Sequence, residues 1–265
     1  MQTGDILRVD LSFLQTRSEI PQAESIPLHI VFEDEDLLVI NKPVGMVVHP
    51  GAGVFSGTLV NAVLAHCGAT LPSLGEPARA GIVHRLDRDT SGVMVVAKSQ
   101  LALTELSRQF ADHSQKRIYM ALVYGKPEKS GHIETWHGRD PRNRIKYASL
   151  PEGQGKKAIL DFRLRETFHA GLVSMVECEL YTGRTHQIRV QMTSLKHPLL
   201  GDSLYGTPSP SLKANKELWA ALQILLTRQM LHAHLLGFRH PRTGQVLTFE
   251  CPPPPDFTEV VAALC

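Results

Sequence analysis

Hydrophobic and polar residues follow two different periods along the chain, and each period predicts one kind of element. Between residues 172 and 181, hydrophobic residues alternate with Glu177 and Glu179, which is the pattern of a strand with one buried face. The run VMVVAK at 93–98 is typical of a strand buried on both faces. Further strands are predicted within 28–43, on either side of an acidic turn at 33–36, and at 116–125, 158–167, 231–238 and 245–250.

The helical period occurs in fewer places. Leu103, Leu106 and Phe110 recur at the spacing of one helix face, which predicts a helix over 100–113. Other helices are predicted at 58–66, within 184–198, near 213–228 and after the prolines of 251–255, where Asp256 and Glu259 have the spacing of a capping box. Many strands in hairpins with few helices between them predict an antiparallel-rich α+β fold.

The chain divides into a short appendage and one body. Residues 1–25 hold one short predicted strand and a polar stretch, and the body runs over 26–265. Within the body, 136–157 is predicted to be a long polar loop because charged residues, prolines and glycines crowd it.

Composition places the chain among soluble globular proteins. It is 43% hydrophobic and 20% charged with a net charge of +2, so any basic surface must be local. No window approaches the roughly 18 apolar residues of a membrane span, and the first residues do not form a signal peptide. The four cysteines are scattered without disulfide or metal spacing, which indicates free thiols and a cytoplasmic location.

Candidate chemistry is concentrated in GIVHRLDRDTSG, residues 81–92, just before the buried strand. Asp87 lies between Arg85 and Arg88, so its carboxylate should stay ionised, which makes it a nucleophile or base rather than an acid. Local composition alone favours an ordinary surface ion-pair cluster. A second motif, TGRTHQIR, brings Arg189 to the border of a helical hydrophobic stripe, and a half-buried arginine needs an anion. Asp87 is the natural partner.

Motifs for binding a cofactor, a phosphate or a metal are absent or weak. The chain has no dinucleotide-binding glycine pattern, no P-loop and no zinc-protease helix motif. His232 and His234 fall on one face of a predicted strand and could bind a metal, but no third ligand lies nearby in the sequence. Histidines that form hydrogen bonds at a sheet edge are the favoured interpretation.

Five separated motifs, in order, resemble the RluA family of pseudouridine synthases over residues 26–255. They are EDEDLLVINKPVGMVVHPGAG, HRLDRDTSGVMVVAK, KRIYMALVYG, TGRTHQIRVQM and HPLLGDSLYG. The resemblance implies the pseudouridine synthase fold, an antiparallel-rich mixed β-sheet flanked by helices and loops. It implies isomerisation of uridine in RNA, with no metal or redox cofactor.

Site roles follow from the same resemblance. The family's catalytic aspartate falls on Asp87, its active-site tyrosine on Tyr119, and the arginine that pairs with the aspartate on Arg189. Arg85 resembles an arginine that enters the RNA stack where the base has left. Whether the aspartate attacks C1′ or takes a proton from C2′ stays open.

Two departures from the family pattern affect substrate choice. Gln191 stands where the family commonly has histidine, which changes an RNA contact or a packing contact. Relatives of the type that modifies large-subunit ribosomal RNA, which the motifs resemble most, usually carry an N-terminal S4 RNA-binding domain. Here 3–13 resembles only the last strand of such a domain.

The expected partner is therefore RNA, with the uridine in a stem-loop of large-subunit ribosomal RNA, and the expected protein is a monomer. Transfer RNA as the host, or a non-catalytic RNA-binding module, are the alternatives. The segment 139–146 carries four cations against Asp140, and it is either an RNA-contacting loop or a solvated charged loop. Those cations are Arg139, Arg142, Arg144 and Lys146.

Overall fold

The computed structural model describes residues 20–51, 53–68 and 71–265. The short strand predicted near the N-terminus, and most of the 1–25 appendage, lie outside the described residues. The strands are β1 (Ile30–Glu33), β2 (Leu37–Lys42), β3 (Ser91–Ala97), β4 (Lys116–Tyr124), β5 (Ser130–Arg139), β6 (Tyr147–Leu150), β7 (Lys156–Phe168), β8 (Val173–Leu180), β9 (Leu231–Arg239) and β10 (Val246–Glu250). The α-helices are α1 (Leu59–Cys67), α2 (Gln100–Ala111), α3 (Gln187–Ser194), α4 (Pro210–Ala214), α5 (Lys216–Leu225) and α6 (Pro255–Leu264).

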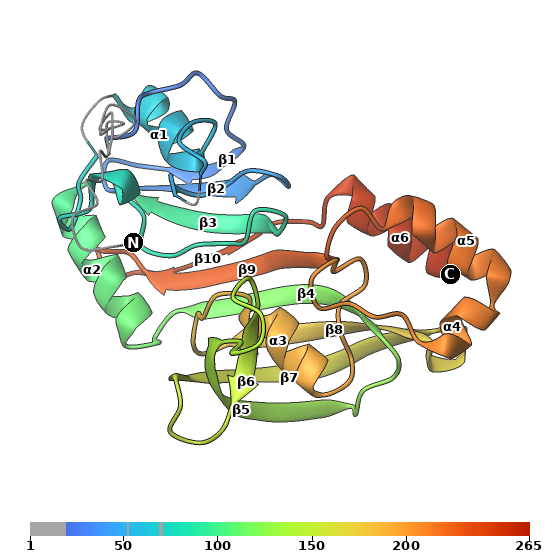
Figure 1. The fold of residues 1–265 in the computed structure, drawn as a ribbon. Helices are drawn as coiled ribbons and strands as arrows, with labels where there is room; N and C mark the ends of the chain where they lie inside the picture. The colour runs from blue at the N-terminus through green and yellow to red at the C-terminus, as the bar shows by residue number, and fades with distance from the viewer. Residues whose placement is uncertain (1–19, 52, 69–70) are drawn as a thin grey trace, which may run out of the picture.

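One ten-stranded sheet runs through the molecule, in the order β1-β2-β3-β9-β4-β8-β7-β5-β6, with β10 paired to β9 (Figure 1). Every strand pair is antiparallel except β3 with β9. The α+β fold predicted from the pattern is confirmed. No helix in the described part of the chain is both long enough and apolar enough to cross a bilayer.

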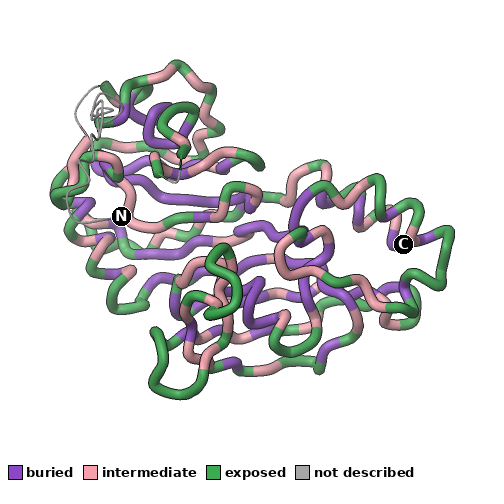
Figure 2. The backbone as a smooth tube through the Cα atoms, viewed as in Figure 1, coloured by how far each residue is buried: buried purple, intermediate pink, exposed green. Residues whose placement is uncertain are grey.

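The sheet separates three hydrophobic clusters, and the buried segments of Figure 2 follow its strands. The largest lies under α1 and α3, a second under α4 to α6, and a third between α2 and the strands β2 and β3. Strand β4 alternates between the first two, because Tyr119 and Ala121 pack into one while Met120 and Leu122 pack into the other. Tyr119 thus lies on the face of the sheet that α3 covers.

Gly92 allows the one parallel strand pair to form. It pairs with Ala233 of β9, and a Cβ built on it would lie 2.1 Å from the Ala233 carbonyl oxygen. Its φ of +120° is also a conformation that other residues rarely adopt. Only glycine lets β3 approach β9 this closely, and the approach places the preceding segment, 84–90, at the end of both strands.

The segment predicted as one long loop over 136–157 contains parts of three strands, so that prediction was wrong. β5 continues to Arg139, β6 runs over 147–150 and β7 begins at Lys156. Strand β6 is the edge strand of the sheet, and the residues of β5, β6 and β7 that fall within 136–157 are mostly exposed or half-buried, so no hydrophobic alternation marks them in the sequence. The true loops are the two connections on either side of β6, at 140–146 and 151–155.

The capping box predicted for the C-terminal helix is also absent. Pro254 is the N-cap residue of α6, and its first turn has no side-chain cap. The Asp256 carboxylate instead accepts hydrogen bonds from Arg228, at 2.6 Å from Nε and 3.0 Å from Nη2. Without that anion the buried Arg228 guanidinium would be a costly unpaired charge, so Asp256 pairs with Arg228 and does not cap the helix.

His232 and His234 are hydrogen-bonded within the sheet. His232 Nε2 and His234 Nδ1 each donate to the Cys251 carbonyl at 2.9 Å, and His232 Nδ1 is 2.9 Å from Ser91 Oγ. This is the interpretation that the sequence favoured over a metal site. Burial lowers the pKa of His232 to about 4.

Acid should destabilise the fold through buried histidines. Burial lowers the pKa of His84 to about 3, and its Nε2 accepts from Val95 N–H at 3.1 Å. In the unfolded chain His84 and His232 both titrate near 6.5. Between that value and the folded pKa the unfolded state binds more protons, so stability falls as pH falls. Each histidine contributes a slope of about 1.4 kcal/mol per pH unit in that window.

Urea unfolding at neutral pH and at about pH 5 tests this expectation. His232→Gln should remove one proton from the pH dependence, whereas the same change at the exposed His29 should leave it as in the wild type. If His232→Gln and His29→Gln show the same change of stability with pH, the low pKa does not belong to His232.

Candidate active site

Asp87 lies in a turn that the backbone and two buried cations hold at the end of β3. Thr90 N–H donates to the Asp87 carbonyl at 3.1 Å, and the side chain of Leu86 is buried beneath it. Lys42 Nζ donates to the Arg88 carbonyl at 3.0 Å, and Arg228 Nη1 to the Asp89 carbonyl at 3.1 Å. The turn is therefore fixed by long-range contacts on both sides of Asp87.

Lys42 is fully buried, which is rare for a lysine, and the sequence analysis did not single it out. Its ammonium group also donates to the carbonyls of Pro43 at 2.7 Å and Met46 at 2.9 Å. Burial lowers the pKa of Lys42 to about 7, although the nearby charge of Asp89 and Asp87 favours the protonated form. Lys42 ties the segment after β2 to the turn that carries Asp87.

Arg189 of α3 holds the Asp87 carboxylate, as predicted from charge alone. Its Nη1 donates to Asp87 Oδ2 at 3.1 Å. On its other edge, Nε and Nη2 donate to both oxygens of Asp202 at 2.7 and 2.8 Å. The exposed fractions of the three side chains are 17% for Asp87, 8% for Arg189 and 0% for Asp202. The buried arginine is thus shared between one carboxylate that faces outward and one that is sealed.

Asp202 orients this arrangement. Burial on its own would raise the pKa of Asp202, but its hydrogen bonds from Arg189 bring the pKa below the ordinary value. Its Oδ1 also accepts from the backbone N–H groups of Leu204 and Tyr205 at 3.0 Å each. Burial lowers the pKa of Arg189, but the two carboxylates outweigh burial and raise it, so the guanidinium stays charged.

Tyr205 and His186 complete the wall beside Asp87. The Tyr205 ring lies 5.0 Å from the Arg189 guanidinium carbon, and its hydroxyl accepts from Tyr147 N–H at 2.8 Å. That hydroxyl also lies 2.9 Å from His186 Nδ1. Burial lowers the pKa of His186, and its Nε2 lies 4.0 Å from Asp87 Oδ2.

His186 adopts an unusual backbone conformation to reach this position. It precedes α3 with φ of 57° and ψ of 25°, in the left-handed region that costs a non-glycine residue energy. Such strain persists where the surrounding structure fixes the residue, and it is common at functional sites.

Asp87, Tyr119 and Arg85 line a common cleft of about 470 Å³. Tyr119 is largely buried, and burial raises the pKa of its phenol, so the ring is neutral. Arg85 is exposed. Among the described residues that line the cleft, Asp87 supplies the one carboxylate, against arginines 79, 85, 117, 184 and 189. The cleft offers a flat ring and a carboxylate within a positively charged wall.

The cationic segment 139–146 joins β5 to β6 and is attached to this wall. The Arg139 guanidinium lies 4.4 Å from the Tyr147 ring, and Lys146 Nζ lies 5.7 Å from the Tyr205 ring. Arg142 and Arg144 are exposed. The structure thus brings the segment next to Tyr205, which contacts Arg189, but it does not place these cations in the cleft lining.

Gln191 is a packing residue. It is fully buried, and its Nε2 donates to Thr135 Oγ1 at 3.0 Å and to the Ala158 carbonyl at 2.9 Å. Gln187 Nε2 donates to its Oε1 at 3.1 Å. Of the two effects considered for this departure from the family pattern, the structure supports the packing contact.

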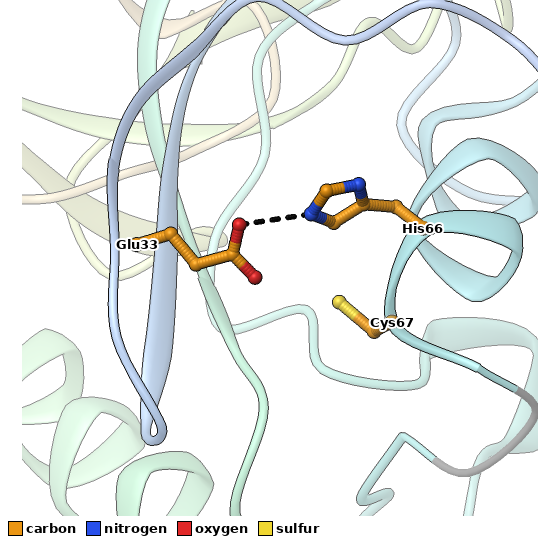
Figure 3. Close-up of side chains that lie close together, drawn as sticks. All are labelled: Glu33, His66 and Cys67. Atoms are coloured by element: carbon orange, nitrogen blue, oxygen red, sulfur yellow. Dashed lines mark hydrogen bonds and ion pairs between the residues drawn. The ribbon is translucent and has the colours of Figure 1, made fainter.

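A cluster of metal-ligating residue types lies outside the cleft, between β1 and α1 (Figure 3). His66 Nε2 donates to Glu33 Oε2 at 2.9 Å, with Cys67 beside them. Lys98 Nζ donates to the other oxygen of Glu33 at 2.5 Å, which lowers the pKa of that carboxyl. Burial raises the pKa of the Cys67 thiol, so it stays protonated. The cluster is an ion-pair network that ties β1 to α1, and we assign no metal to it.

Comparison with known families matches residues 36–194 to RNA pseudouridylate synthase. The chain therefore belongs to the RNA pseudouridylate synthase family, and the family predicted from the motifs is confirmed. Its members are isomerases that act on uridine in RNA.

The relatives extend this match beyond the domain. The chain is 48% identical over 252 residues to ribosomal large subunit pseudouridine synthase D of Zymomonas mobilis, which covers 95% of this chain and 77% of that protein. The protein of the same name from Neisseria meningitidis serogroup A is 47% identical, over 91% of this chain and 62% of its own length. Human RNA pseudouridylate synthase domain containing 4 has the same fold, with a TM-score of 0.67 at 21% identity over 89% of this chain and 92% of its own.

Sequence reasoning found the acid and its partner but missed the groups that hold them. Asp202 is the one acid in the hydrophobic run PLLGDSLYG, a signal that could have marked it as a buried anion. Lys42 stands at the end of a hydrophobic strand in the same way. His186 and Tyr205 gave no such signal, since their contact depends on how α3 packs against the segment that follows it.

Proposed function

We propose that this protein converts uridine to pseudouridine in large-subunit ribosomal RNA and that Asp87 is its catalytic residue. The observation that carries the proposal is the Asp87 carboxylate, held by Arg189 at 3.1 Å in a cleft that Tyr119 also lines. In the reaction the N1–C1′ bond of uridine breaks, the uracil turns and a C5–C1′ bond forms. The C5 hydrogen leaves and N1 gains a proton, so the atoms balance.

Four residues of the cleft each have a proposed part in this reaction. A uridine must leave its helix to reach Asp87, and the Tyr119 ring gives the uracil a surface on which to stack. Arg85, exposed at the cleft, fills the place that the base leaves. Asp87 acts on the sugar as nucleophile or base, and the hydrogen bond from Arg189 orients its carboxylate.

Ribosomal RNA is the proposed host because relatives named for the large ribosomal subunit match nearly the whole chain. Transfer RNA is the alternative host. A non-catalytic binding module would have no use for a carboxylate at Asp87 held in the cleft by the buried Arg189–Asp202 pair, so we propose an enzyme. We also propose a cytoplasmic location, which the free cysteines support. That the protein is a monomer is an expectation from the sequence.

Mapping pseudouridines in total RNA from cells with and without the gene tests the proposal. Loss of one or a few large-subunit sites, restored by the wild-type gene but not by Asp87→Asn, is the expected result. Loss confined to transfer RNA would overturn the host and leave the chemistry in place. An unchanged pseudouridine map would overturn the function.

The segment 139–146 is predicted to contact phosphates in the RNA backbone. Changing both Arg142 and Arg144 to alanine should weaken binding of a uridine-containing stem-loop. It should also reduce the slope of log affinity against log salt by about 0.7 for each lost single-strand contact. Fluorescence anisotropy over a salt series measures both quantities.

Lys126 and Lys129 provide the matched control, since both are exposed cations in the connection after β4. Changing these two to alanine should leave the salt dependence as in the wild type. If the two double variants behave alike, the 139–146 segment is an ordinary solvated loop.

A further inference from the structure

Arg117 is a buried arginine that has no carboxylate partner among the described residues. Its exposed fraction is 6%, and it lines the cleft from β4, two residues before Tyr119. Its Nη2 donates to the carbonyls of Leu180 at 3.4 Å and Tyr181 at 3.0 Å. Its Nε is buried and has no hydrogen-bond acceptor in the part of the chain that the structure describes. Carbonyl oxygens supply dipoles but no net charge, so the guanidinium is not neutralised within the described part of the protein.

The other buried arginines of the described residues are neutralised. Arg189 lies between Asp87 and Asp202, and Arg228 pairs with Asp256. An unpaired buried charge is costly, and an arginine does not escape the cost by losing its proton. A site that keeps such a charge in a cleft facing solvent is arranged to receive an anion from outside.

Two residues pack against the Arg117 guanidinium in the cleft. Phe110 lies under it, 5.6 Å from the guanidinium carbon to the ring centroid. Gly183 lies over it, and a Cβ built there would be 2.7 Å from Nη1. Because Gly183 has no side chain, Nη1, which has no acceptor among the described residues, keeps its access to the cleft.

Position along β4 relates Arg117 to the substrate base. Residues two apart on a strand point to the same face and lie about 7 Å apart. If the uracil stacks on Tyr119, a phosphate of the same or the adjoining nucleotide lies within reach of Arg117. We propose that Arg117 binds a phosphodiester group next to the extruded uridine, and so positions the nucleotide over Asp87. This inference rests on the proposed function.

An RNA in which one phosphodiester is replaced by an uncharged methylphosphonate tests the Arg117 contact directly. The full chain would be tested on a short uridine-containing stem-loop and on two copies with one methylphosphonate, placed 5′ or 3′ of the target uridine. Arg117→Met should weaken binding of the natural RNA by about 10- to 100-fold, the range of a charge-assisted hydrogen bond. One methylphosphonate should weaken wild-type binding by a similar factor. It should have no further effect on Arg117→Met.

Stability separates this role from a structural one. An unpaired buried charge replaced by a hydrophobic side chain of similar length should leave the melting temperature unchanged or higher. Gly183→Ala should weaken RNA binding through occlusion of Nη1, with Arg117 still present. Lys126→Met, an exposed cation lost from the connection after β4, is the control and should bind RNA as the wild type does.

Three results would overturn the assignment. Arg117→Met could bind natural RNA as tightly as the wild type, it could unfold at a clearly lower temperature, or its effect and the methylphosphonate effect could multiply. Multiplied effects would indicate a contact to the base instead of the backbone. Wild-type turnover of the natural stem-loop tests the proposed function separately. If only another RNA is modified, the same comparison is made on that RNA.

Discussion

Asp87→Asn is expected to lower pseudouridine formation by about 1,000-fold or more while leaving folding and RNA affinity nearly unchanged. Amide and carboxylate have almost the same shape, but the amide is neither a nucleophile nor a base. The protein should stay folded because Asp202 still neutralises Arg189 through two hydrogen bonds. Single-turnover assays on a stem-loop, with melting temperature and anisotropy measured in parallel, check all three expectations.

Asp89 supplies the matched control, because the same change two positions on removes a carboxylate from the same turn. Its side chain is 45% exposed, and its nearest cation, Arg88, lies 4.0 Å away. Asp89→Asn should therefore keep near wild-type turnover. If Asp87→Asn retains appreciable activity and Asp89→Asn does not, the catalytic role belongs to Asp89.

The ion pair between Asp87 and Arg189 was predictable although 102 positions separate the residues. The prediction used one physical rule, that a half-buried charge needs its counter-charge, and it paired Arg189 with Asp87, one of the two aspartates in the first motif. The rule accounted for only one side of Arg189. Because a guanidinium has two edges that can pair, the helix face that buries Arg189 also required Asp202, which the sequence analysis left unassigned.

Burial also decides which strands were predicted correctly from the sequence. Strands such as β3, buried on both faces, are marked in the sequence by an unbroken hydrophobic run. Strand β6 is not marked, since Tyr147 and its neighbours are held by pairing with β5 and by the Tyr205 hydroxyl rather than by burial. These contacts of β6, which were not predicted from the sequence, also bring the 139–146 segment to the site. Local pattern identified the scaffold, and the arrangement around Asp87 depends on packing.

Arg189→Ala should be the most destabilising of the proposed changes and should also abolish turnover. It leaves Asp202, whose side chain is 0% exposed, without its counter-charge, and breaking a buried pair in this way costs about 3–5 kcal/mol. For a domain of this size that is a fall in melting temperature of roughly 10 °C. Thermal unfolding followed by circular dichroism measures it, with the exposed Arg163→Ala as a control that should melt with the wild type.

A double variant separates stability from catalysis at this arginine. Arg189→Met combined with Asp202→Leu removes both buried charges, so much of the lost stability should return. Activity should not return, because Asp87 would have neither its hydrogen bond nor the positive charge that orients it. A melting temperature within about 2 °C of the wild type for Arg189→Ala would show that the buried pair contributes little to the fold. Recovery of turnover in the double variant would show that Asp87 does not depend on Arg189 for its action on the sugar.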